Sequence, residues 1–187
     1  LCVAGMCVGS LFFIRNQSKD KKSVIIYPWL YAAICSLVFF GWLVVDWRGR
    51  EIEEQKRLGL LNSANNVAKN LDIELLSKLS FSPEDKNKPE YIRLNEYFRA
   101  YSPMIEGVKW IYLMAMVKDT IVFGPEDIEL TSPDSTIPGT PYLQPPAELL
   151  QLFANQQPIT FGPYKDEYGT FVSSFAPVLD PSSGRLL

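Results

Sequence analysis

The side chains of this chain that could do chemistry are mainly carboxylates and hydroxyls, because its 187 residues include no histidine. Without histidine the chain lacks the usual general base of Ser-His-Asp and Cys-His catalysis, and also a phosphate-accepting imidazole. Acidic neighbours occur as Glu84 with Asp85, Glu126 with Asp127, and Asp166 with Glu167. We predict that the first two pairs are solvated charges in loops. The side chains of the third pair are expected to point away from each other, because neighbouring residues in extended backbone face opposite sides. The sequence therefore predicts no catalytic residues.

Motifs for phosphates, dinucleotides and metal ions are also missing from the sequence. There is no P-loop, no GxGxxG and no CxxC, and the three cysteines (Cys2, Cys7 and Cys35) all lie in apolar segments. We predict no cofactor and no metal site. The net charge of -3 argues against a nucleic-acid partner, because nucleic-acid binders normally present a basic face.

An uncharged segment runs from Val24 to Val45, without one Asp, Glu, Lys or Arg. A helix of that length rises about 33 Å, which is enough to cross a hydrocarbon core of about 30 Å. Trp29 near one end and Trp42 near the other lie where interfacial aromatic side chains are found. We predict a transmembrane helix over residues 24–46, with the lipid bilayer as a partner.

The ends of the sequence have the features of a fragment of a longer, multi-pass membrane protein. Residues 1–14 are apolar and are expected to be the end of a truncated transmembrane helix, followed by a basic linker over 15–23. Lys and Arg are equally frequent on the two sides of the 24–46 span, but they are denser in the linker. A cytoplasmic linker would place the C-terminal domain outside the cell (inner) membrane.

The next segment, residues 47–80, is predicted to be one long juxtamembrane helix. Its apolar residues recur at spacings of three and four: Leu58, Leu61, Ala64, Ala68, Leu71 and Leu75. A second helix is predicted from Pro89 to Ser102-Pro103, after a solvated loop over residues 82–88.

From Val108 onward the pattern changes to that of strands. Lys118-Asp119 is predicted to join Val108–Val117 to Thr120–Phe123 in a hairpin whose first strand is apolar on both faces. A proline-rich loop over residues 124–146, a short helix, and strands over 159–161 and 170–179 are expected to follow. This order predicts an α+β fold, with an antiparallel sheet, helices on one face and the loop over the other.

Three stretches carry a resemblance to a known family: residues 110–114, 137–142 and 162–178. With the preceding span and long helix, they resemble the Cache (PAS-like, extracytoplasmic) sensor domains of bacterial and archaeal membrane receptors. The resemblance covers about residues 48–187, with residues 81–187 as the sensor domain proper, and it implies a C-terminally truncated domain.

The resemblance also implies a small-molecule site between the sheet and the loop that crosses it. The residues expected to bind that ligand are Trp110, Tyr112, Met114, Thr140, Tyr142, Tyr168, Ser173 and Phe175. Alternation along the last strand leaves Ser174 as the alternative to Ser173, and core packing as the alternative role of the aromatic side chains. No Arg lies on these strands, so an aromatic site would suit a neutral or amphipathic ligand.

The function expected from this resemblance is extracytoplasmic sensing, relayed through the membrane to an effector beyond the sequence. That effector is expected to be a histidine kinase, with a diguanylate cyclase or chemoreceptor as alternatives. A homodimer through the long helix is expected, with contacts at Leu58, Leu61, Ala64 and Leu71. The alternative class is a ligand-free, membrane-anchored structural or assembly module.

Overall fold

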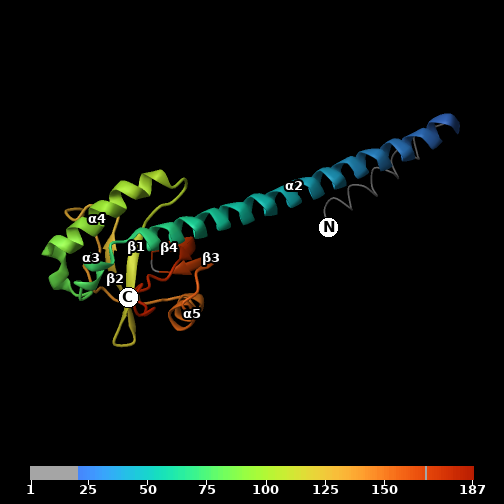
Figure 1. Cartoon of the computed structure of the whole chain (residues 1–187). Coiled ribbons are helices and arrows are strands. Elements are labelled where there is room, and N and C mark those ends of the chain that lie inside the picture. Colours follow the sequence, from blue (N-terminus) through green and yellow to red (C-terminus); the bar gives the residue numbers. More distant parts are fainter. Residues whose placement is uncertain (1–20, 167) are drawn as a thin grey trace. The chain divides into compact units, whose positions relative to one another are not determined.

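The computed structural model describes residues 21–166 and 168–187, which form a mixture of helices and small antiparallel sheets (Figure 1). The truncated span predicted over 1–14 and most of the basic linker predicted over 15–23 lie outside the described residues. The chain divides into two compact units, Leu1–Glu54 and Gln55–Leu187, and each is described by itself.

In the first unit the described residues belong to helix α2 (Lys21–Asn70), which continues into the second unit. Within the described part of the chain, one helical stretch is long and apolar enough to cross a membrane, and it begins at Pro28. Trp29, Leu37 and Val45 expose 75%, 74% and 71% of their surface. Apolar side chains exposed on every side of a helix suit a lipid environment better than water.

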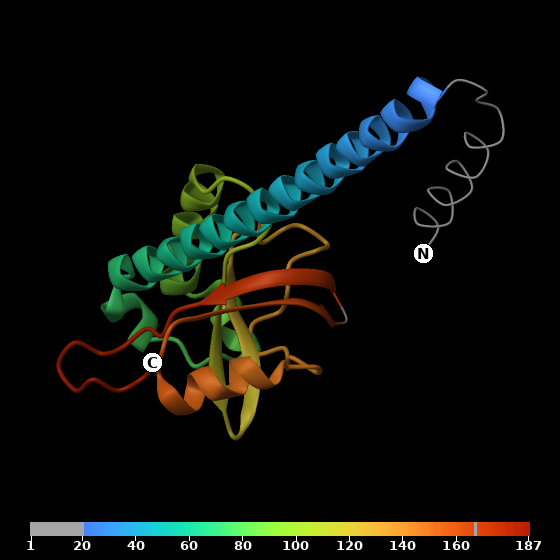
Figure 2. The ribbon, with the colours of Figure 1, turned by 90° about the vertical axis from the view of Figure 1, so that its right-hand side faces the viewer.

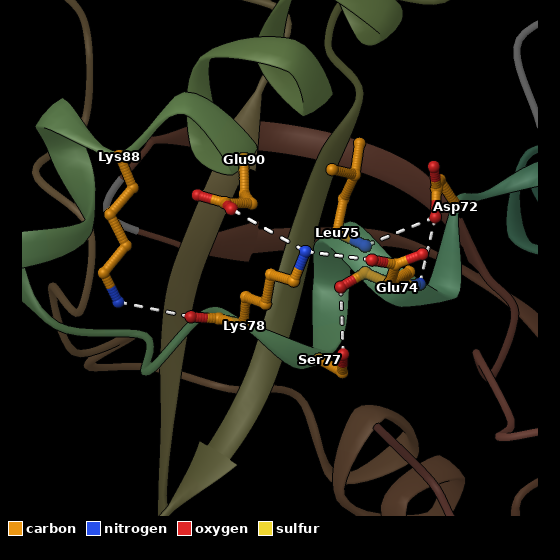
Figure 3. Close-up of polar contacts among 7 residues, drawn as sticks. All are labelled: Asp72, Glu74, Leu75, Ser77, Lys78, Lys88 and Glu90. Atoms are coloured by element: carbon orange, nitrogen blue, oxygen red, sulfur yellow. Dashed lines mark hydrogen bonds and ion pairs between the residues drawn. The ribbon is translucent and has the colours of Figure 1, made fainter.

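The helix predicted over 47–80 ends earlier, at Asn70, and a separate short helix α3 (Ile73–Ser77) follows. Asp72 causes the break, because its carboxylate accepts hydrogen bonds from the backbone N–H groups of Glu74 (3.0 Å) and Leu75 (3.3 Å), as Figure 3 shows. Aspartate favours this capping position over a helix interior, so it begins a new helix.

Lysine side chains join α3 to helix α4 (Pro89–Tyr101) in the same view (Figure 3). Lys78 pairs with Glu74 of α3 at 3.0 Å and with Glu90 of α4 at 3.9 Å, and Lys88 donates to the Lys78 carbonyl at 3.2 Å. Exposed pairs of this kind contribute little stability, so the packing of apolar side chains must hold the two helices together.

That packing forms what we call the helix-side cluster. Its buried members are Val67, Leu71, Leu76, Leu94, Phe98 and Val178. Leu71 belongs to this core, so the prediction that it contacts a dimer partner is wrong. Leu58, another residue of the predicted dimer contact, exposes 60% of its surface.

Strands β1 (Tyr112–Val117) and β2 (Thr120–Glu126) form the predicted hairpin. Lys118 (φ 48°) and Asp119 (φ 64°) make the turn, with the positive φ angles that a two-residue hairpin turn requires at both positions. Strand β2 runs three residues further than predicted, into the expected loop. Its second edge is occupied by residues 139–142, where the Phe123 N–H donates to the Thr140 carbonyl at 3.0 Å and the Tyr142 N–H to the Ile121 carbonyl at 2.8 Å.

The remaining elements are helix α5 (Ala147–Asn155) and strands β3 (Ile159–Asp166) and β4 (Gly169–Phe175). β3 and β4 pair antiparallel in a second two-stranded sheet, which lies across the first ribbon in Figure 2. The single sheet expected from the sequence is therefore two ribbons. β4 ends before Ala176-Pro177 rather than at Leu179, since proline has no N–H for a strand ladder.

β1 lies between two cores, as its two apolar faces predicted. Ile111 and Leu113 pack on the helix-side cluster, whereas Tyr112 and Met114 pack on a second cluster that includes Leu149 of α5. The structure is compatible with the predicted α+β class, because it combines helices with small antiparallel sheets. The expectation that helices cover one face is wrong, because α5 contributes to the core on the side opposite α4.

Candidate functional site

The second cluster, which we call the aromatic cluster, is formed by chain segments far apart in sequence. Its buried members are Ile121, Phe123, Tyr142, Leu149 and Phe161, and its partly buried members are Tyr112, Met114, Phe153, Ile159, Tyr164 and Phe175. They come from β1, β2, the long loop, α5, β3 and β4. Four of the eight residues predicted to bind a ligand belong to it: Tyr112, Met114, Tyr142 and Phe175.

Phe123 on β2 is the ring that connects three tyrosines. Its centroid lies 5.7 Å from Tyr112, 5.4 Å from Tyr142 and 5.7 Å from Tyr168. These separations are those of favourable edge-to-face and tilted ring pairs. Tyr168 exposes 46% of its surface, so it forms the solvent side of this group.

The loop and the β3–β4 turn are joined by a hydrogen bond from the Tyr142 phenol to Asp166 Oδ2, at 2.5 Å. The other carboxylate oxygen accepts from the N–H groups of Tyr168 (2.8 Å) and Gly169 (3.1 Å). Burial, and secondarily the hydrogen bond to Asp166, raise the pKa of Tyr142, so that it remains a neutral donor. Asp166 thus holds both the turn and the loop.

A second polar group lies beside β4. The Tyr164 phenol and the Ser173 hydroxyl are 2.9 Å apart. Burial raises the pKa of the neighbouring Tyr112 phenol, and a hydrogen bond with Ser173 partly opposes that rise. Ser173 is therefore the serine that faces the aromatic cluster, whereas Ser174 lies 2.6 Å from the Thr160 hydroxyl.

Trp110 lies before β1 and reaches the cluster through Phe171. The two ring centroids are 5.4 Å apart, and Phe171 is 6.5 Å from Tyr164. The Lys109 ammonium lies over both rings, 3.9 Å from the Trp110 centroid and 5.5 Å from that of Phe171. This is a cation–π arrangement at the edge of the site.

Thr140 differs from the other predicted residues. Its hydroxyl donates to the Ile137 carbonyl at 2.7 Å, so it caps a turn of the loop. The loop also runs along the edge of β2 rather than over an open sheet face. Thr140 thus supports the placement of Tyr142, and nothing in its contacts links it directly to the aromatic rings.

Sequence reasoning missed Phe123, Asp166, Tyr164 and Lys109. Phe123 carried a usable signal, because it is an aromatic residue in a predicted strand. Tyr164 lies just beyond the strand predicted over 159–161, so its place in β3 was not foreseen. The roles of Asp166 and Lys109 depend on the approach of distant segments, and no sequence pattern indicates it.

Two acidic residues described as solvated by the sequence analysis are buried. Asp85 exposes 1% of its surface and Glu126 6%, so that expectation is wrong for both. Ser80 donates to Asp85 through its N–H (2.9 Å) and hydroxyl (2.8 Å), and Lys88 lies 2.6 Å away. Burial opposes ionisation of Asp85, but the hydrogen bonds from Lys88 and Ser80 outweigh it and lower its pKa.

Glu126 has the opposite balance. Its Oε1 accepts from the Ser135 hydroxyl at 3.1 Å and from the Thr136 N–H at 2.5 Å, but burial is the larger influence and raises its pKa. Asn95 on α4 donates to the backbone carbonyls of Glu126 (2.6 Å) and Ile128 (2.7 Å). These contacts fix the start of the long loop against α4.

In residues 21–166 and 168–187, no group of three or more Cys, Asp or Glu side chains could hold a metal ion. The chemistry that the aromatic cluster can offer is recognition: aromatic faces, phenol and serine hydroxyls, and one carboxylate. Comparison of the chain with protein-family models, curated proteins and solved structures found no match.

Proposed function

We propose that this chain is the sensory part of a membrane-bound signal-transduction receptor, and that it recognises a small molecule at the aromatic cluster. The observation that carries this proposal is the group formed by Tyr142, Asp166 and Tyr168. It joins a long loop to a hairpin turn through one hydrogen bond and exposes an aromatic ring to solvent. Apolar walls with a few placed polar groups are typical of ligand sites.

The receptor assignment also draws on α2 and on the resemblance to Cache domains. α2 contains the candidate membrane span and also Val67 of the helix-side cluster, so the anchor and the folded domain share one element. In this proposal the domain is extracytoplasmic, in a multi-pass protein of the cell (inner) membrane. It acts as a homodimer and relays occupancy to a histidine kinase, or otherwise to a diguanylate cyclase or chemoreceptor.

A second candidate function, a ligand-free structural or assembly module, is favoured by the internal hydrogen bonds of the site. The phenols of Tyr142 and Tyr164 already bond to Asp166 and Ser173. A core that satisfies its own hydroxyls needs no ligand to complete it.

A thermal-shift screen of the full chain in maltoside micelles separates the two candidates. A ligand at 100 times its Kd stabilises the native state by about 2.7 kcal/mol, which raises the Tm by several degrees for a domain of this size. The variant S173A removes one polar group of the site, and S174A, one residue along the same strand, is its matched control.

The receptor proposal expects at least one metabolite to raise the Tm of wild type and S174A more than that of S173A. If no compound of a broad metabolite set stabilises the chain, the receptor proposal fails and the structural module is the better description.

A further inference from the structure

We propose that the Trp110–Phe171 ring pair is a binding site for a methylated ammonium group, and that the Lys109 ammonium occupies it in the unliganded protein. This inference rests on the proposed function, since it names the chemical class of the ligand at one edge of the same site.

The geometry of Lys109 is the first step. Its Nζ lies 3.9 Å from the Trp110 centroid and 5.5 Å from the Phe171 centroid, both within the roughly 6 Å at which a cation is attracted to a ring face. No carboxylate in the described parts of the chain forms an ion pair with Lys109. The aromatic rings are therefore the partners that the structure gives this charge.

The Phe171 ring is held in place by contacts independent of Lys109, and the Trp110 ring packs against it. The two rings lie 5.4 Å apart with their planes 55° from each other, so they form a corner instead of a flat stack. Phe171 also contacts Tyr164, whose phenol is fixed by Ser173 at 2.9 Å. Gly169 leaves room for the ring, because a Cβ there would lie 2.9 Å from Phe171 Cζ. Because the two rings already form this corner without a ligand, binding does not have to order them, and less conformational entropy is lost.

Lysine is a weak occupant of such a corner. Its ammonium is compact and strongly hydrated, and at an exposed position its attraction to a ring is small. A methylated ammonium carries the same charge under an apolar surface, which is why aromatic cages recognise choline-like groups. Such a ligand would displace the Lys109 side chain into solvent at little cost.

The test uses the fluorescence of Trp110 in the full chain. Trp29, Trp42 and Trp47 are replaced by phenylalanine, which leaves Trp110 as the one tryptophan. The protein is placed in nanodiscs of phosphatidylglycerol, a lipid without a quaternary ammonium. It is titrated with choline chloride against sodium chloride at equal ionic strength, and with 3,3-dimethylbutan-1-ol, the neutral carbon analogue of choline.

We expect choline to change Trp110 emission saturably, and the neutral analogue to bind at least about threefold more weakly. Lys109→Gln removes the internal competitor and should lower the choline Kd by about two- to fivefold. Lys118→Gln, in the β1–β2 turn, is the matched control and should leave the Kd unchanged. Phe171→Leu, checked for native circular dichroism, should raise the Kd.

Equal affinity for choline and its neutral analogue would overturn the inference, as would equal Kd values for the Lys109 and Lys118 variants. No saturable choline response would overturn it too. If another metabolite stabilises the chain in the thermal-shift screen while choline does not bind, this inference fails and the proposed function stands. If nothing stabilises the chain, both fail.

Discussion

The two clusters on either side of β1 differ in the kind of contact that builds them. The helix-side cluster is mainly aliphatic, and Leu94 and Phe98 expose 1% and 0% of their surface. The aromatic cluster places phenol groups and the Ser173 hydroxyl among its rings, and Tyr168, whose ring contacts Phe123 of the cluster, is half exposed. Close-packed aliphatic side chains stabilise the fold through non-directional interactions, whereas hydroxyls and ring faces make directional contacts that can also recognise a ligand. This difference is the one that the proposed function requires, with one side of the strand maintaining the fold and the other recognising the ligand.

The largest effect is expected from Leu94→Ala, which opens a cavity in the helix-side cluster. A buried leucine truncated to alanine costs about 2–5 kcal/mol, so the unfolding midpoint in guanidinium should fall clearly. Tyr168→Ala on the aromatic side should cost much less because its ring is half exposed. Chemical denaturation of the full chain in micelles, followed by far-ultraviolet circular dichroism, measures both. Equal losses would remove the distinction between the two clusters.

The next effect concerns the two buried carboxylates. Asp85→Asn replaces a buried charge that accepts hydrogen bonds from Ser80 and Lys88, and should cost about 1–3 kcal/mol at pH 7. The folded pKa of Asp85 lies below its ordinary value of 3.8. The stability that ionised Asp85 contributes is therefore present above its ordinary pKa of 3.8 and is lost as the pH falls through its folded pKa. The difference in unfolding midpoint between wild type and variant should shrink below about pH 4.

Glu126→Gln is the contrasting variant. Its folded pKa lies above the ordinary value of 4.5, so ionisation destabilises the fold as the pH rises from 4.5 through the folded value. Glutamine keeps the accepting oxygen for Ser135 and Thr136 without the charge. This variant should gain stability relative to wild type as the pH rises, opposite in sign to Asp85→Asn. The same pH dependence in both variants would contradict the assignment of opposite pKa shifts.

A smaller stability effect than that of Leu94→Ala is expected from Tyr142→Phe, which removes the hydrogen bond to Asp166 and keeps the ring packing. We expect a loss of about 1–2 kcal/mol in thermal unfolding. Tyr142→Phe should also reduce any ligand-induced rise in Tm by more than Leu94→Ala does. The reverse order, with a ligand response lost in Leu94→Ala and kept in Tyr142→Phe, would place recognition away from the aromatic cluster.

Several local features of this protein could be predicted because they depend on neighbouring residues alone. Lys118-Asp119 is a polar pair between two apolar runs, and it forms the hairpin turn. Pro89 and Ser102-Pro103 bracket α4, and Pro145-Pro146 precede α5. The two apolar faces of β1 predicted its place between two cores. The end of α2 was missed because Asp72 interrupts an apolar stripe that otherwise continues.

The sequence by itself determined the apolar helix, the order of the helices and strands other than α3, and the mixed α and β class, because periodicity and turn chemistry are local properties. Only the tertiary structure decided that Asp85 and Glu126 are buried, that Tyr142 meets Asp166, and that Lys109 lies over Trp110 and Phe171. Burial and the pairing of distant side chains depend on how the two ribbons cross and how the loop follows the edge of β2. These arrangements come from the packing of whole elements, and no short stretch of sequence encodes them.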